Sequence, residues 1–168
     1  MADDVDELYS KVESVVKEVN AKITSGMKSR AYRAANELRN ASQEVLRGQR
    51  SGRRYIVPGT GSMKYNKRKK TAKITYKTYT ASAPGEPPAV RTGTFRASWQ
   101  AKTESTGSGD NFSVKAEIES AARTDNGKYV LGAILENGTS KMAPRPYKEK
   151  IQEKALPKVK KIFKEPYF

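Results

Sequence analysis

The chain has 168 residues, and neither cysteine nor histidine is among them. A protein without these residues has no disulfide framework, no zinc site built from thiolate or imidazole ligands, and no Ser–His or Cys–His nucleophile. Histidine is also the commonest general acid–base residue in enzymes. We therefore expect a protein that is not an enzyme and that uses no metal and no other cofactor.

Long apolar runs are missing as well. Mean hydropathy is -0.81 and 36% of the residues are hydrophobic. No window approaches the roughly 18 continuous apolar residues that a membrane span needs. The opening residues, MADDVDELYS, are acidic, unlike a secretory signal or a transit peptide. We expect no contact with a membrane, and a location in the cytoplasm or in a particle assembled there.

Acidic residues are absent from Val45 to Gly85, although the same stretch holds eleven bases. The whole chain carries a formal net charge of +15, whereas its first 13 residues contain five acids and one lysine. Opposite charges at the end and in the middle of one chain indicate either head-to-tail packing of copies or a polyanion nearby. Composition does not choose between these two explanations.

A long helix is predicted at the N-terminus. Apolar residues recur at steps of three and four between residues 3 and 47, no proline interrupts them, and Gly48 supplies a stop signal. An unbroken helix of this length would measure roughly 65 Å. Two alternatives stay open: a break near Thr24-Ser25-Gly26 that makes a helical hairpin, or one long helix. The helix either lies on the protein's own sheet or forms an arm, residues 1–48, that packs on neighbouring chains.

A long basic hairpin is predicted next. Tyr55-Ile56-Val57 is a short strand candidate that ends at Pro58-Gly59, and residues 72–80 alternate in the manner of a second strand. The intervening residues are rich in glycine, serine and lysine, and they are predicted to form the loop at the tip of the hairpin. A third strand, half-buried, is expected over residues 112–119.

The remaining elements are helical or ambiguous. A short helix is predicted after Thr92, which would cap it, with Phe95 and Trp99 on one face. Residues 129–138 fit either a strand or a short helix. Residues 147–164 have the helical period, and Pro157 should bend or interrupt that helix.

The predicted fold class is therefore α+β, with a long N-terminal helix, an antiparallel sheet with a long basic hairpin, a short middle helix and a C-terminal helix. Residues 49–168 are expected to form a single structural unit after the N-terminal arm.

Two segments carry specific information. The first is APGEPPAVRTGTFRASW, residues 83–99, and the second is LENGTSKMAPRPY, residues 135–147, about 40 residues further on. In this order they closely resemble the tail-completion (head–tail joining, or neck) family of long-tailed double-stranded DNA bacteriophages. That family has a Pro-Pro-x-Val-x-Thr-Gly-x-Leu-Arg-x-Ser pattern, with Phe95 replacing the leucine here, and then a Leu-Glu-x-Gly-Thr-Ser-x-Met-x-Pro-Arg-Pro pattern.

The resemblance implies a structural virion protein. It would form a homo-oligomeric ring, a hexamer, through which DNA passes at the head–tail junction, after assembly in the host cytoplasm. The implied partners are copies of itself, the neighbouring connector or stopper protein, and tail-terminator or tail-tube proteins, with genomic DNA as a further candidate. The residues it assigns to interfaces or to the structural motif are Pro87, Pro88, Thr92, Gly93, Arg96, Glu136, Gly138, Thr139, Pro144, Arg145 and Pro146.

The residue chemistry of the second segment predicts a rigid backbone. Gly138 permits a positive φ at a tight turn. Pro144 and Pro146 exclude a helix or an inner strand at Arg145, so that its guanidinium is presented from a stiff extended segment. A fixed arginine suits a carboxylate. Two partners remain open: Glu136 of the same chain, as an internal latch, or an acid of a neighbouring subunit.

The basic residues support a second hypothesis, a nucleic-acid-binding protein. Clustered bases with interleaved tyrosines would suit phosphate contact and base stacking, although a solvated hairpin tip or a dock for an acidic partner ring explains the cluster better. The candidate contacts to DNA or to an acidic partner are Lys64, Lys67, Arg68, Lys69, Lys70 and Lys73. A metal-dependent nuclease would need converging carboxylates, and the candidates for it are Asp110, Glu117, Glu119 and Asp125. Scattered surface acids explain these four better.

Overall fold

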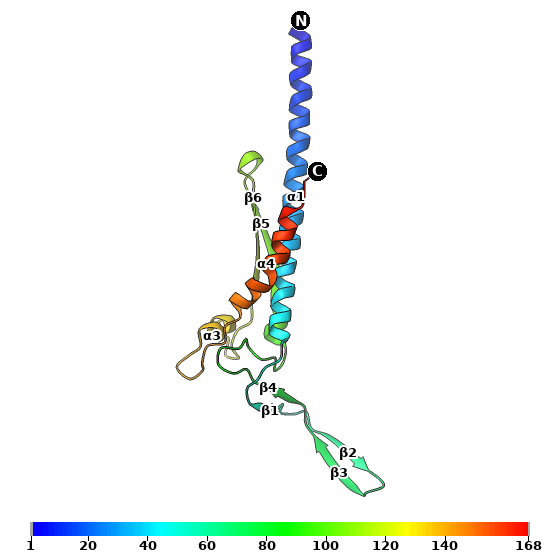
Figure 1. Ribbon diagram of the computed structural model, residues 1–168, viewed down its shortest axis with the longest axis vertical. Coiled ribbons are helices and arrows are strands. Elements are labelled where there is room, and N and C mark those ends of the chain that lie inside the picture. Colours follow the sequence, from blue (N-terminus) through cyan, green and yellow to red (C-terminus); the bar gives the residue numbers. More distant parts are fainter. Residues whose placement is uncertain (1, 168) are drawn as a thin grey trace. The chain divides into compact units, whose positions relative to one another are not determined.

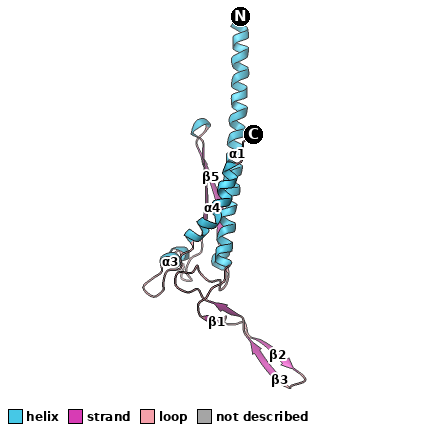
Figure 2. Cartoon of the chain, viewed as in Figure 1, coloured by secondary structure: helices cyan, strands magenta, loops and turns pink. Residues whose placement is uncertain are grey.

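A computed structural model of the chain describes residues 2–167, with the side chains of residues 2–6, 8 and 110 left out of the description. The fold is of the mixed α+β class, with a long N-terminal helix, antiparallel hairpins, a short middle helix and a C-terminal helix, as predicted (Figures 1 and 2). The elements are α1 (Ala2–Arg47), β1 (Arg54–Ile56), β2 (Ser62–Asn66), β3 (Thr71–Thr75), β4 (Thr78–Thr80), α2 (Thr94–Ala97), β5 (Trp99–Thr106), the 3-10 turn η1 (Gly109–Asn111), β6 (Ser113–Ser120), α3 (Leu131–Asn137) and α4 (Lys148–Lys164).

The chain divides into two compact units. The first unit comprises residues 1–39, 100–119 and 155–168, and the second comprises residues 40–99 and 120–154. Both α1 and α4 therefore contribute one part to each unit.

Helix α1 is continuous over 46 residues, which answers the question that its sequence pattern left open (Figure 1). Thr24, Ser25 and Gly26 all lie within it. A Cβ atom at Gly26 would come within 3.0 Å of the Tyr167 ring. Glycine therefore lets the C-terminal tyrosine pack closely on the helix, and it does not break the helix.

The first unit has a core made mainly of alanines. Ala31, Ala34 and Ala35 of α1 and Ala155 of α4 are buried, and these small side chains let two helices approach closely. The bulkier Ile162 of α4 is buried with them. β5 and β6 form a two-stranded hairpin (Figure 1).

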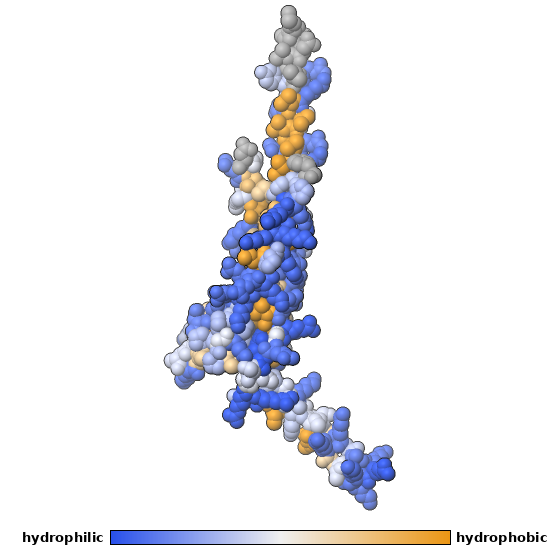
Figure 3. Space-filling view, viewed as in Figure 1, coloured by the Kyte–Doolittle hydropathy of each residue, from blue (hydrophilic) through white to orange (hydrophobic). Residues whose placement is uncertain are grey.

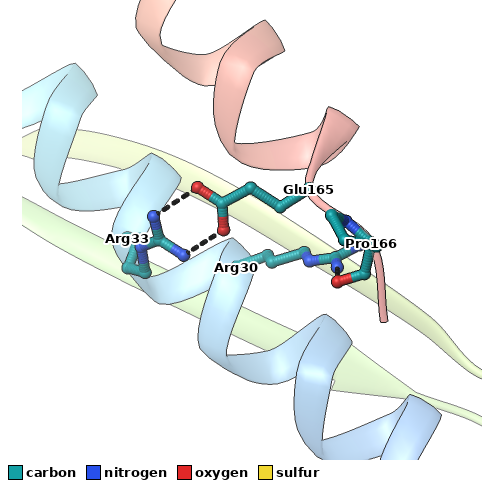
Figure 4. A network of polar contacts seen from close by, with 4 residues as sticks. All are labelled: Arg30, Arg33, Glu165 and Pro166. Carbon is teal, nitrogen blue, oxygen red and sulfur yellow. Dashed lines mark hydrogen bonds and ion pairs between the residues drawn. The ribbon is translucent and has the colours of Figure 1, made fainter. Parts of the chain in front are cut away.

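Polar contacts at the C-terminus complete the first unit (Figure 4). Arg33 donates two hydrogen bonds to the Glu165 carboxylate, at 2.6 and 2.7 Å. Arg30 is buried, donates to the Pro166 carbonyl at 2.6 Å, and lies 3.5 Å from the centre of the Tyr167 ring. The residues after α4 are thus held against α1 by both charge and an aromatic ring.

Of the two outcomes predicted for Pro157, a bend or an interruption of the helix, the interruption does not occur, because α4 continues through the proline. The proline is exposed, whereas Ala155 and Ile162 on either side of it are buried. Their packing keeps the helix continuous despite the backbone hydrogen bond that proline removes.

The second unit contains the predicted long hairpin, built from two short ladders. β1 pairs antiparallel with β4, and β2 pairs antiparallel with β3. The prediction of one strand over residues 72–80 was wrong in detail, because the strand is interrupted at Tyr76 and Lys77. There Thr60 Oγ1 accepts the Lys77 N–H at 3.0 Å. Residues 62–66, predicted as loop, form β2, so that the tip of the hairpin is only the turn over residues 67–70.

An aromatic cluster forms the core of the second unit. The rings of Phe95, Trp99 and Tyr147 meet edge to face, with centroids 5.6 to 5.8 Å apart. Leu46 of α1 and Ile151 of α4 are buried in the same unit. Residues 131–137, which fitted a strand or a helix, are helical.

Candidate functional site

The two motif segments lie together in the second unit, around one groove of about 610 Å³. Residues 88–96 of the first segment form part of its wall, and three residues of the second segment, Leu135, Met142 and Arg145, form another part. The backbone joins the segments directly, because Gly85 N–H donates to the Pro144 carbonyl at 3.2 Å. The sequence suggested that these segments belong together, and the groove is the place where they meet.

Arg145 forms a second link, and it corrects a prediction. Its Nη1 donates to both the carbonyl and the hydroxyl of Ser82, which is 6% exposed. The predicted internal latch between Arg145 and Glu136 is therefore wrong. The guanidinium has five N–H donors, so that a single nitrogen can serve both oxygens of Ser82, and it ties the second segment to the chain just before the first.

Glu136 has a different role. Its Oε2 accepts the backbone N–H groups of Tyr147 at 3.0 Å and Lys148 at 3.3 Å, where α4 begins. The first N–H groups of a helix have no partner within the helix, and the helix dipole favours a negative charge at that end. Glu136 thus caps α4 from the end of α3.

Gly138 makes possible the turn between Glu136, which caps α4, and Arg145, which binds Ser82. Its backbone has φ 74° and ψ -171°, a region that only glycine occupies readily. A Cβ atom there would lie 2.6 Å from the Met142 carbonyl oxygen and 2.8 Å from the Pro144 nitrogen. Thr139 and Met142 then exchange backbone hydrogen bonds at 2.8 and 3.2 Å. The predicted positive φ at Gly138 is confirmed.

The first segment is held by its own set of hydrogen bonds. Pro87 and Pro88 are buried, and Arg50 donates to the Pro88 carbonyl through Nε and Nη2. Glu86 accepts from Ser51 Oγ, from Ser51 N–H and from Ala83 N–H, and these hydrogen bonds lower its pKa to about 2. An extended, proline-rich segment is in this way fixed to the chain that follows α1.

The short helix α2 differs slightly from the prediction. Its N-cap position is Gly93, with φ 89°, and no side chain caps it there. The Thr92 hydroxyl accepts the Thr94 N–H at 3.4 Å, so that it supports the turn from one residue further out. The Thr92 cap is therefore corrected to a turn stabilised by Thr92 and a positive φ at Gly93.

Sequence reasoning missed the role of Tyr147, which joins the aromatic core to both segments. The Tyr147 hydroxyl donates to the Gly132 carbonyl at 3.0 Å, and a Cβ atom at Gly132 would come within 2.7 Å of that hydroxyl. Burial, with a smaller effect of Glu136, raises the pKa of Tyr147 to about 12. The signals in the sequence were the aromatic residue directly after Pro-Arg-Pro and the glycine inside an apolar helix.

The groove combines apolar and cationic residues. Val90, Leu131 and Leu135 contribute apolar surface to it, and Arg91, Arg96 and Arg123 contribute positive charge. Within the part of the chain that the structure describes, Arg91 and Arg96 make no ion pair. The groove has the chemistry to receive an apolar segment that carries carboxylates.

The basic candidates lie on the β2–β3 hairpin. Lys64 and Lys73 are directly opposite each other in the ladder, and Lys67, Arg68, Lys69 and Lys70 form the turn. Asn66 Oδ1 accepts the N–H groups of Arg68 and Lys69, which fixes the turn. All six basic side chains are exposed. The hairpin therefore concentrates positive charge on one face and at its tip.

The carboxylate candidates are placed differently. Glu117 is paired with Lys115 at 2.6 Å, which lowers the pKa of the carboxyl, and Glu119 is paired with Lys102 at 2.5 Å. Asp125 lines the groove, and the side chain of Asp110 lies outside the described part of the structure. Among the side chains that are described, no group of three or more acids, histidines or cysteines is placed to hold a metal ion.

None of the helices described here has the length and apolar character needed to cross a membrane. Comparison with protein-family models, with curated proteins and with solved structures finds no match to this chain.

Proposed function

We propose that the chain is a structural protein of a bacteriophage neck, where copies of it form a ring that joins the head to the tail. The resemblance of its two motif segments to the tail-completion family supports this function. The observation that carries the proposal is that these two segments, far apart in the sequence, fold into one rigid frame around a single groove.

The rigidity of this frame comes from contacts that bring no reacting groups together. Gly85 N–H binds the Pro144 carbonyl, Arg145 binds Ser82, and Glu136 caps α4. Such an arrangement holds a surface in a fixed shape, which is what a protein needs when it must fit neighbouring subunits. Arg91 and Arg96 at the groove then offer charge to an acidic segment of a partner.

In the proposed mechanism, each copy presents this frame to the next copy in the ring and to the connector and tail proteins that stack on either side. Six copies follow from the family resemblance. A head-to-tail contact that repeats around an axis closes into a ring, and a ring leaves a central channel for the genome. In this mechanism the joining of head and tail depends entirely on the complementary surfaces of neighbouring subunits.

A second candidate function, nucleic-acid binding, is favoured by one observation. Lys64 and Lys73 face each other across the β2–β3 ladder, where like charges destabilise the pair unless an anion lies near them. A phosphate backbone could supply that anion. Binding to DNA would then fall steeply with salt for the monomeric chain.

Electron microscopy of purified virions tests the proposed function. We expect density for this chain in a ring at the junction of head and tail, and we expect its deletion to yield filled heads and separate tails. Joined, infectious particles that form without the chain would refute the proposal. Salt-dependent DNA binding by the monomer, together with the absence of a ring in particles, would favour the second candidate.

A further inference from the structure

The β2–β3 hairpin has an apolar face that nothing in the described chain covers. In the ladder, Met63 is opposite Ile74 and Tyr65 is opposite Ala72. Directly paired residues point to the same side of a hairpin, so these four side chains share one face, and the lysine pair shares the other. Met63, Tyr65 and Ile74 are 70%, 59% and 55% exposed.

Such a hairpin is incomplete by itself. Every residue of β2 and β3 is exposed. A two-stranded hairpin without a covering layer is at best marginally stable in water, because its apolar face gains nothing from folding. An exposed apolar face beside a polar one is also the usual mark of a surface that binds another protein.

Helix α1 carries a second uncovered apolar face in its N-terminal half. Val12, Val15, Val16 and Val19 follow the helical period and are 38 to 57% exposed. Figure 3 shows apolar surface gathered along this part of the helix. On its polar side, ion pairs such as Glu13–Lys17 and Glu18–Lys22 stabilise the helix. The helix is thus stabilised without a contact to the valine side chains, which remain exposed and available to a partner.

We propose that the apolar face of the β2–β3 hairpin in one copy packs on the valine face of α1 in a neighbouring copy. The inference rests on the proposed ring, and it names the surfaces that close it. The hairpin is long enough to cover the valine face: five strand residues span about 16 Å, and the seven helical steps from Val12 to Val19 span about 10 Å.

The charges around the two faces are complementary as well. Residues 53–77 contain nine bases and no acid, whereas residues 1–20 contain six acids and two lysines. Duplex DNA offers negative charge too, but it would leave Met63 and Ile74 without an apolar partner. Pairing of α1 with another α1 would cover the valines and leave the hairpin bare. A contact between the two different faces covers both with one repeated interface and also brings the opposite charges together.

Single cysteines test this contact directly, because the chain has none of its own. One chain carries Ile74→Cys and another, distinguished by a tag, carries Val16→Cys; the two are mixed, allowed to assemble and oxidised. Since each chain has one cysteine, a mixed disulfide must join two copies. The matched controls move each cysteine to the opposite side of its element, as Thr75→Cys on the hairpin and Ser14→Cys on the helix.

We expect the Ile74→Cys and Val16→Cys chains to form about tenfold more mixed disulfide than either control pair, because the bond requires Cα atoms within about 7 Å. A second measurement uses Ile74→Ser, which should weaken assembly about tenfold in sedimentation, while Thr75→Ser leaves it unchanged. An excess of Val16→Cys homodimers, equal yields in the controls, or a chain that stays monomeric would each overturn the contact. Virions whose neck lacks the chain would instead refute the proposed function, even where the cross-link forms.

Discussion

The carboxylate of Glu136, at the end of α3, accepts the backbone N–H of Tyr147 at 3.0 Å, just before α4 begins. One side chain therefore sets the position of the helix that follows it. The segment between the two residues contains the Gly138 turn and the two prolines, so both of its ends are fixed: one by this cap, the other by the helix from which Glu136 comes. Shape in this region depends on few residues, and their substitution has predictable effects.

Replacing Glu136 by alanine should lower stability by about 1 kcal/mol, the usual value of a helix cap. For a chain of this size that corresponds to a fall in melting temperature of about 2–4 °C. Thermal unfolding followed by circular dichroism measures it. Glu149→Gln, in the first turn of α4, is the control: it removes an acid near the same helix end without removing the cap. Equal losses in the two variants would contradict the capping role.

Gly138 and Gly59 form a matched pair for a second prediction, because both have φ 74°. Gly59→Ala adds a Cβ atom in open space and should cost about 1 kcal/mol, the strain of the left-handed backbone. Gly138→Ala adds strain in a region of φ and ψ that only glycine occupies readily, together with a clash with the Met142 carbonyl, and it should cost about 3 kcal/mol or more. Urea denaturation of both variants gives the difference. Equal costs would show that the turn relaxes easily.

Much of the fold could be predicted from the sequence, because its signals are local. The helical period of residues 3–47 and the stop at Gly48 gave a helix that ends at Arg47. Glycine at position 138, in a tight turn after Glu136 and Asn137, gave the positive φ. These signals reflect the backbone preferences of the residues themselves, and the local conformations that they favour are kept in the folded chain.

The partners of charged groups could not be predicted in the same way. Opposite charge suggested a pair between Glu136 and Arg145. Instead, the Glu136 carboxylate accepts hydrogen bonds from the free N–H groups at the start of α4, and Arg145 donates to Ser82. No spacing in the sequence marks Ser82 as an acceptor. The strand β2 was missed for another reason: glycine and lysine on both sides obscured the alternation of Met63 and Tyr65 with polar residues.

The hydrogen bonds of Glu86 lead to a prediction about pH. Its pKa falls from 4.5 to about 2 in the folded chain, mainly because the Ser51 hydroxyl donates to the carboxylate. A lowered pKa means that the unfolded chain binds the proton more readily. The stabilisation is therefore complete above pH 4.5 and is lost as the pH falls toward 2.

Melting temperatures measured between pH 5 and 2 should accordingly fall less steeply in Glu86→Gln than in the natural sequence. Ser51→Ala should give an intermediate slope, because it removes the strongest of the hydrogen bonds and leaves the backbone ones. If all three proteins follow parallel curves, Glu86 does not carry this part of the acid sensitivity.

The C-terminus allows a comparison between an aromatic contact and an ion pair in the first unit. Tyr167 lies over the guanidinium of Arg30, which is 5% exposed, and packs against Gly26. Arg33 and Glu165 form an ion pair whose side chains are 48% and 37% exposed. Water and salt screen an exposed pair strongly, whereas a ring that covers a buried cation keeps its effect.

Tyr167→Ala should therefore destabilise the chain by about 1 kcal/mol, and the loss should persist in high salt. Glu165→Gln should cost less, and its small effect should vanish as salt is added. Thermal unfolding of both variants at low and high salt separates the two contributions. A larger and salt-independent loss for Glu165→Gln would mean that the ion pair, rather than the ring, holds the end of the chain on α1. The geometry favours the ring, because its contact partner is buried and the glycine at position 26 leaves room for it.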